Sequence, residues 1–164
     1  MPVQTHQINL QGLSGGMFWA SLAAILFATI GFSTCGWVHY SDTWTGLWSS
    51  YTSISRSIFA NYGWFQGVQA TATLGIIFLS FAFIFIILYN FVHNVSISKS
   101  LVLKLIVACC VITVISILVS VALFGVKAEG FKLHWSYAFF CIGGILTLFL
   151  LVLACVQMKR ASII

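Results

Sequence analysis

Four long apolar stretches alternate with short polar ones along the chain. No Lys, Arg, Asp or Glu occurs before Asp42, between Arg56 and Lys99, between Lys104 and Lys127, or between Lys132 and Lys159. Each gap can hold a transmembrane helix, which needs about 20 apolar residues. The pattern predicts helical spans at residues 17–37, 70–92, 105–126 and 135–156, with a large loop at 38–69. Helices are favoured over barrel strands because the stretches lack alternating polarity.

Composition agrees with this pattern. The chain is 61% hydrophobic and 5% charged, whereas a soluble domain carries about 25% charged residues. The acyl chains of a bilayer must therefore be part of its solvent. The longest segment outside the spans, 38–69, is shorter than the roughly 40 residues that a free-standing core needs. We expect a single membrane domain over residues 1–164, with membrane lipid as a partner.

Small side chains recur within the predicted spans. They allow helix backbones to approach closely inside lipid, where water does not drive association. We expect them to pack the helices of this chain together, and the alternative is a face for a second membrane protein. The residues are Ala20, Ala24 and Ala28 in the first span, Ser116 and Ser120 in the third, and Gly143 and Gly144 in the fourth.

Enzymatic chemistry has few residues to draw on. Asp42 and Glu129 are the only carboxylates, so a general acid–base pair is hard to assemble. A metal site is an alternative to ordinary interfacial histidines, since four possible ligands fall near the same membrane face: His39, Asp42, Glu129 and His134. The spans contain no Asp, Glu, Lys, Arg or His, the residues that mark ion and proton paths. We expect no enzyme, no cofactor, no bound metal and no nucleic-acid partner.

The cysteines and the C-terminus suggest two modifications or contacts. All five cysteines fall in the spans. Cys155 lies close to Lys159 and Arg160, a position that suits S-palmitoylation, with a plain buried thiol as the alternative. The sequence leaves open whether Cys35 and Cys141 meet. Ser162, Ile163 and Ile164 form a candidate C-terminal ligand for a PDZ scaffold, with a chance tripeptide as the alternative.

The loop and the spans together resemble a known family. Trp37 is followed by Gly46, Leu47 and Trp48, as in the W…GLW signature of claudins and their relatives. The segments "WFQGVQATATLGIIF" (64–78) and "WSYAFFCIGGIL" (135–146) are also similar to this superfamily. The short spacing from Trp37 to Trp48 resembles the peripheral myelin protein and epithelial membrane protein branch.

This resemblance implies a mainly α membrane protein, a left-handed four-helix bundle in the plasma membrane with both termini cytosolic. It also implies a small extracellular antiparallel β-sheet from the first loop and part of the second. Gly46, Leu47 and Trp48 should then lie on top of the bundle, with Trp48 as the anchor. The family's pair of loop cysteines is missing, because residues 38–69 contain none. The sheet must be held by aromatic packing, by the bundle or by another protein.

Two functions follow from the resemblance. The first is a claudin-like protein that organises cell contacts or membrane assemblies, through copies of itself. The second is an auxiliary, non-pore subunit of an ion channel or receptor, similar to the gamma subunits of calcium channels. Candidate partner contacts in the loop are Trp44, Tyr51 and Arg56.

Overall fold

The computed structural model describes residues 12–40, 43–51, 57–91 and 98–163, and within them it has four long helices and one small sheet. The helices are α1 (Gly12–Ser33), α2 (Gly63–Phe91), α3 (Lys99–Lys127) and α4 (Trp135–Ile163). The strands are β1 (Val38–Tyr40), β2 (Thr43–Thr45), β3 (Ser50–Tyr51) and β4 (Lys132–Leu133). This confirms the expected four apolar helices and the small antiparallel sheet formed by segments on either side of α2 and α3.

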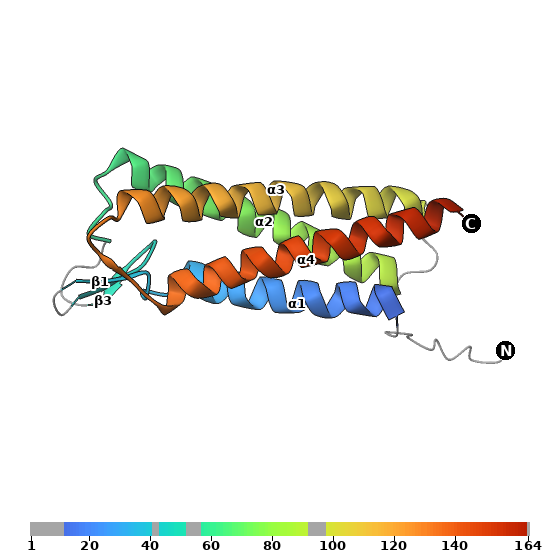
Figure 1. The fold of residues 1–164 in the computed structure, drawn as a ribbon, viewed down its shortest axis with the longest axis horizontal. Helices are drawn as coiled ribbons and strands as arrows, with labels where there is room; N and C mark the ends of the chain where they lie inside the picture. Colours follow the sequence, from blue (N-terminus) through green and yellow to red (C-terminus); the bar gives the residue numbers. More distant parts are fainter. Residues whose placement is uncertain (1–11, 41–42, 52–56, 92–97, 164) are drawn as a thin grey trace.

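The helices form a four-sided bundle (Figure 1). Each packs along two neighbours, so that α1 contacts α2 and α4, and α3 contacts the same two helices. The sheet lies at the end of the bundle where α1 stops and α4 starts, and the beginning of α1 and the end of α4 lie at the opposite end (Figure 1). All four helices are long and apolar enough to cross a membrane.

The helices mostly extend beyond the predicted spans into polar flanks, but the first one stops short of its predicted end at residue 37. The first helix begins at Gly12 and stops at Ser33, so Trp37 lies outside it. The second begins at Gly63, in the loop expected at 38–69. The third starts where the Ser98 hydroxyl accepts a hydrogen bond from the Leu101 N–H, an ordinary N-cap.

The helices approach closely at small residues. A Cβ atom added to Gly143 of α4 would lie 2.8 Å from both the backbone nitrogen and the Cβ atom of Ala28 in α1. A Cβ atom at Gly31 would lie 2.5 Å from the Phe140 backbone nitrogen. On the other side of the bundle, the Ser120 hydroxyl donates to the Val68 carbonyl at 3.3 Å. These contacts set the backbone separation between α1 and α4 and between α2 and α3.

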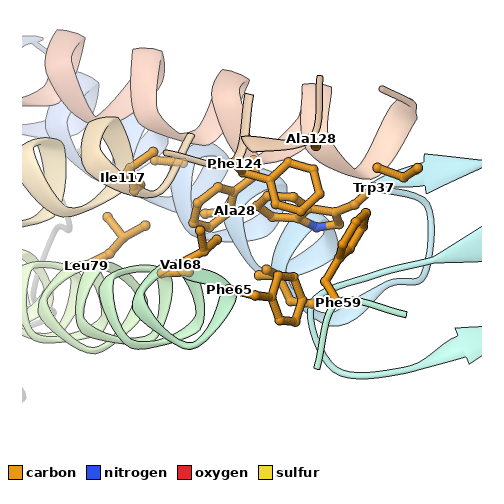
Figure 2. Packing of buried hydrophobic residues seen from close by; sticks show 14 residues of the cluster. Ala28, Trp37, Phe59, Phe65, Val68, Leu79, Ile117, Phe124 and Ala128 are labelled. Atoms are coloured by element: carbon orange, nitrogen blue, oxygen red, sulfur yellow. The ribbon is translucent and has the colours of Figure 1, made fainter. Parts of the chain in front are cut away.

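The core has two parts along the bundle axis. Near the sheet, it is rich in aromatic rings, and Figure 2 shows Trp37 against Phe124, with Phe59 and Phe65 beside them. At the far end it consists of aliphatic, methionine and cysteine side chains around Met17, with further phenylalanine rings at its margin. The aromatic part therefore lies where the sheet meets all four helices.

The sheet has the strand order β3-β2-β1-β4, with antiparallel pairing throughout. Directly paired residues project to the same face of a sheet. The register therefore defines an inner row toward the bundle and an outer row on the opposite face. The inner row is Ser50, Thr45, Val38 and Leu133, and the outer row is Tyr51, Trp44, His39 and Lys132.

Gly143→Ala should destabilise the bundle, because the new methyl group would meet the Ala28 backbone, which cannot rotate away. Overpacking of this kind typically costs about 1–3 kcal/mol. The measurement is the thermal midpoint in detergent, followed by circular dichroism. Gly16→Ala is the matched control, since its Cβ atom would lie 3.8 Å from a Leu153 methyl carbon, an ordinary contact. Equal midpoints for the two variants would contradict the close α1–α4 approach.

Candidate functional site

Trp37 joins the sheet to the helix bundle. Its side chain has no exposed surface, and its indole N–H donates a 2.6 Å hydrogen bond to the Gly31 carbonyl. That carbonyl lies in the last turn of α1, where backbone acceptors lack helical partners. The indole ring centroid lies 4.8 Å from that of Phe124 and 5.5 Å from that of Phe140. One side chain therefore contacts α1, α3 and α4.

The Gly46-Leu47-Trp48 segment lies against the same end of the bundle. A Cβ atom at Gly46 would collide with the Thr34 carbonyl oxygen and lie 2.8 Å from the Cys35 Cα atom, so only glycine fits there. Leu47 is fully buried, and its carbonyl accepts a 2.6 Å hydrogen bond from the Gln69 side chain of α2. Trp48 differs from these two. It packs edge-on against Phe32, but 45% of its surface is exposed.

Backbone hydrogen bonds extend the sheet into the helix ends. The Trp37 N–H donates to the Thr45 carbonyl, and the His134 N–H donates to the Trp37 carbonyl, both at 3.0 Å. The buried Ser136 hydroxyl accepts a bond from the Gly36 N–H at 2.9 Å. The connections between α1, β1 and α4 are therefore fixed by the main chain as well as by Trp37.

All five cysteines are free thiols. The Cys35 sulfur lies 2.8 Å from the Ser49 hydroxyl oxygen, whereas Cys141 lines a groove between α3 and α4. No disulfide joins these two cysteines. Aromatic packing and hydrogen bonds to the helix bundle hold the described part of the sheet. Aromatic packing and the bundle were two of the three alternatives expected in place of a disulfide.

The outer row carries the candidate contact residues Trp44 and Tyr51. Trp44 contacts two imidazoles, with ring centroids 4.5 Å from His39 and 4.7 Å from His134, and the two imidazole centroids lie 5.7 Å from each other. Tyr51 pairs with Trp44 across the strands and is 75% exposed. Beside them is a shallow pocket of about 260 Å³ lined by Cys35, Gly36, Trp44, Tyr51 and Trp135.

The small residues singled out in the helices lie in contacts between helices. Ala24, Ala28 and Ser120 are fully buried, Ser116 is 6% exposed and Ala20 is 9% exposed. Gly143 faces Ala28, and Gly144 is half-buried against Ile117. A partner protein cannot reach the fully buried ones, so a lateral interface would have to use other side chains.

The remaining candidates are less well defined. Cys155 is half-buried near the end of α4, and S-palmitoylation there stays a prediction. Arg56, Asp42, Ile164 and the side chain of Ser162 lie outside the described residues. Among the residues that the structure describes, no three His, Cys, Asp or Glu side chains come close enough to hold a metal ion.

Sequence reasoning did not find the pocket beside Trp44. Its walls come from four separate places, namely the segment that follows α1, β2, β3 and the start of α4. The one available signal was the pair Gly36-Trp37, because a glycine there lets another side chain lie on the backbone. A Cβ atom at Gly36 would lie 2.5 Å from the Trp135 indole nitrogen.

No model of a known protein family matches this chain, and no curated protein matches it either.

Trp37→Phe should destabilise the sheet end of the bundle. The substitution removes the only indole N–H that reaches the buried Gly31 carbonyl among the described contacts. Leaving a buried acceptor without its partner costs about 1–3 kcal/mol. Thermal unfolding in detergent measures the change. Trp48→Phe is the control and should stay within about 0.5 kcal/mol, since its ring is partly exposed. A larger loss for Trp48→Phe would show that Trp48, and not Trp37, anchors the sheet.

Proposed function

We propose that the chain is a claudin-like, non-enzymatic protein of the plasma membrane that organises cell contacts or membrane assemblies. The observation that carries this proposal is the sheet, whose inner face is fixed on the bundle while its outer face presents aromatic side chains. A scaffold of this kind can hold a contact surface in one place without an additional domain. The left-handed winding of the helices, as in the claudin plan, belongs to the same proposal.

The proposed orientation places the sheet outside the cell and both termini in the cytosol. Cytosolic loops carry an excess of Lys and Arg close to the spans. Lys99 begins α3, and Arg160 lies in the last turn of α4, both at the end of the bundle away from the sheet. Lys127 and Lys132 lie at the sheet end. The charge bias is small, and the claudin resemblance supplies the rest of the argument.

The outer row has the chemistry of a protein contact. Interfaces draw most of their binding energy from a few aromatic and arginine side chains on a well-ordered surface. Tyr51 is 75% exposed and pairs with Trp44 of the same row in a fixed register. Trp37 and the hydrogen bonds between the strands hold the backbone beneath these side chains. Binding therefore costs little conformational entropy. A second copy on the facing cell is the proposed partner.

Tyr51→Ala should weaken contact between cells that express the protein. A central aromatic contact is typically worth about 2 kcal/mol or more, which is over tenfold in affinity. The measurement is the fraction of aggregated cells in suspension, at matched surface expression. Tyr62→Ala is the matched control, because Tyr62 is 55% exposed but lies outside the sheet. If both variants aggregate like the unmodified protein, the outer row is not the adhesive surface.

One observation favours the second candidate, an auxiliary subunit of a channel or receptor. A groove of about 260 Å³ runs between α3 and α4, lined by apolar side chains that include Leu118 and Ile145. Leu118 is 62% exposed and Ile145 is 66% exposed. In a membrane this groove would be filled by lipid chains or by a helix of a partner, since water is excluded there.

The two candidates differ in what co-purifies in mild detergent from native membranes. A contact protein should yield copies of itself and scaffold proteins, and Ile145→Trp should leave that composition unchanged. An auxiliary subunit should yield a stoichiometric channel or receptor, and Ile145→Trp should release it while the variant stays folded, because the side chain is exposed. Recovery of such a channel would overturn the contact role in favour of the auxiliary one.

A further inference from the structure

The pocket beside Trp44 has the composition of an aromatic cage. Trp44 comes from β2, Tyr51 from β3 and Trp135 from the first position of α4, while Cys35 and Gly36 form the remaining wall. Trp135 can lie there because position 36 has no side chain, as a Cβ atom would collide with the indole ring. Three aromatic rings from separate elements around one small volume are the arrangement that binds quaternary ammonium groups.

The lining selects among cations. No charged residue is among the described residues that line the pocket. The Cys35 thiol is already within 2.8 Å of the Ser49 hydroxyl, which leaves the Tyr51 hydroxyl as the remaining side-chain acceptor. A primary ammonium has three N–H donors that would need acceptors. A trimethylammonium group has none, and it gains from the faces of the aromatic rings.

The size and position of the pocket indicate where such a group comes from. Its volume of about 260 Å³ is below the roughly 300–1,000 Å³ of sites that enclose a whole small molecule. It therefore suits one end of a larger ligand. Trp135 begins α4 and Cys35 follows α1, so the pocket lies at the level where the apolar helices end, which is the headgroup layer of a bilayer.

We infer that this pocket binds the trimethylammonium group of a phosphatidylcholine headgroup from the bilayer that holds the protein. The outer row supplies a partner for the adjoining phosphate. His39 and His134 pack against Trp44 and carry N–H donors, and exposed Lys132 is paired with His39 across the strands on the same sheet face. The inference rests on the proposed membrane insertion and is independent of the proposed contact role.

The experiment is proton NMR of the protein with ¹⁵N-labelled tryptophan in nanodiscs of phosphatidylcholine or of phosphatidylethanolamine with the same acyl chains. The two lipids differ in three methyl groups on the headgroup nitrogen. We expect nuclear Overhauser contacts from the choline methyl protons to the indole protons of Trp44 and Trp135. Trp19, which is 58% exposed and lies in α1 at the other end of the bundle, reports ordinary headgroup exposure.

Variants test the pocket itself. Trp135→Leu should abolish the choline contacts to Trp44 and lower the retention of phosphatidylcholine over phosphatidylethanolamine during purification by about tenfold. This corresponds to about 1.4 kcal/mol, within the range of a cation–π contact. Trp48→Leu is the matched control, because both tryptophans are 45% exposed and Trp48 is not among the lining residues. The indole resonance of buried Trp37 reports that each variant is folded.

The remaining outcomes overturn the inference in distinguishable ways. Choline contacts at Trp19 equal to those at Trp44 and Trp135, or no effect of Trp135→Leu, would show that the pocket has no selectivity. Contacts that appear only when free phosphocholine is added to phosphatidylethanolamine nanodiscs would exclude a lipid source. Failure of the protein to enter nanodiscs would overturn the proposed membrane insertion. Choline contacts that stay unchanged in Tyr51→Ala would also overturn it, because Tyr51 is one of the three aromatic residues that line the pocket.

Discussion

The position of the sheet depends on how the last turn of α1 satisfies its carbonyl groups. A helix end in an apolar setting leaves acceptors without partners, and each buried one is costly. Here the chain turns back after Ser33, and the Trp37 indole N–H reaches the Gly31 carbonyl at 2.6 Å. The same turn places the indole ring among Phe124, Tyr137 and Phe140. Had α1 continued through residue 37, as its apolar composition predicts, the ring would have lain on the helix surface and β1 could not have begun at Val38.

This arrangement explains how the described part of the sheet is held without a disulfide. A loop disulfide is typically worth about 2–4 kcal/mol. Aromatic pairs contribute about 0.5–1.5 kcal/mol each beyond burial, and Trp37 makes three of them. Together they are of the same order as the missing cross-link. The aromatic rings and a disulfide stabilise the sheet in different ways, however. A disulfide acts mainly on the unfolded chain, whereas the rings stabilise the sheet only while the helices remain packed, so sheet and bundle should unfold together.

The sequence allowed the helices to be predicted well and the site only in part. Long stretches without charged residues identify apolar helices, because an uncharged surface of this length is stable mainly inside a bilayer. The small residues Ala24, Ala28 and Gly143 indicated close helix packing. The sheet was expected from the family resemblance. The difference between Trp37 and Trp48 could not be predicted, because both are tryptophans near a helix end, and only the backbone path shows which indole meets a carbonyl. The pocket was missed for a similar reason, since its walls are assembled from residues up to a hundred positions apart.

The side chains on the two faces of the sheet are therefore subject to different physical constraints. On the inner face, Val38 and Thr45 are buried and the Gly46 backbone touches the end of α1, so substitutions there change the fold. On the outer face, the register is already set by the ladder and by Trp37, so side chains can vary without a large effect on stability. Exposed aromatic side chains add little to the free energy of folding, and their contact with water is unfavourable unless another molecule covers them. Because the inner face already supplies the stability, the presence of Trp44, Tyr51 and Trp135 on the accessible side argues for a role in binding. The proposed functions assign these residues to a facing protein and to the lipid headgroups at the edge of the bundle.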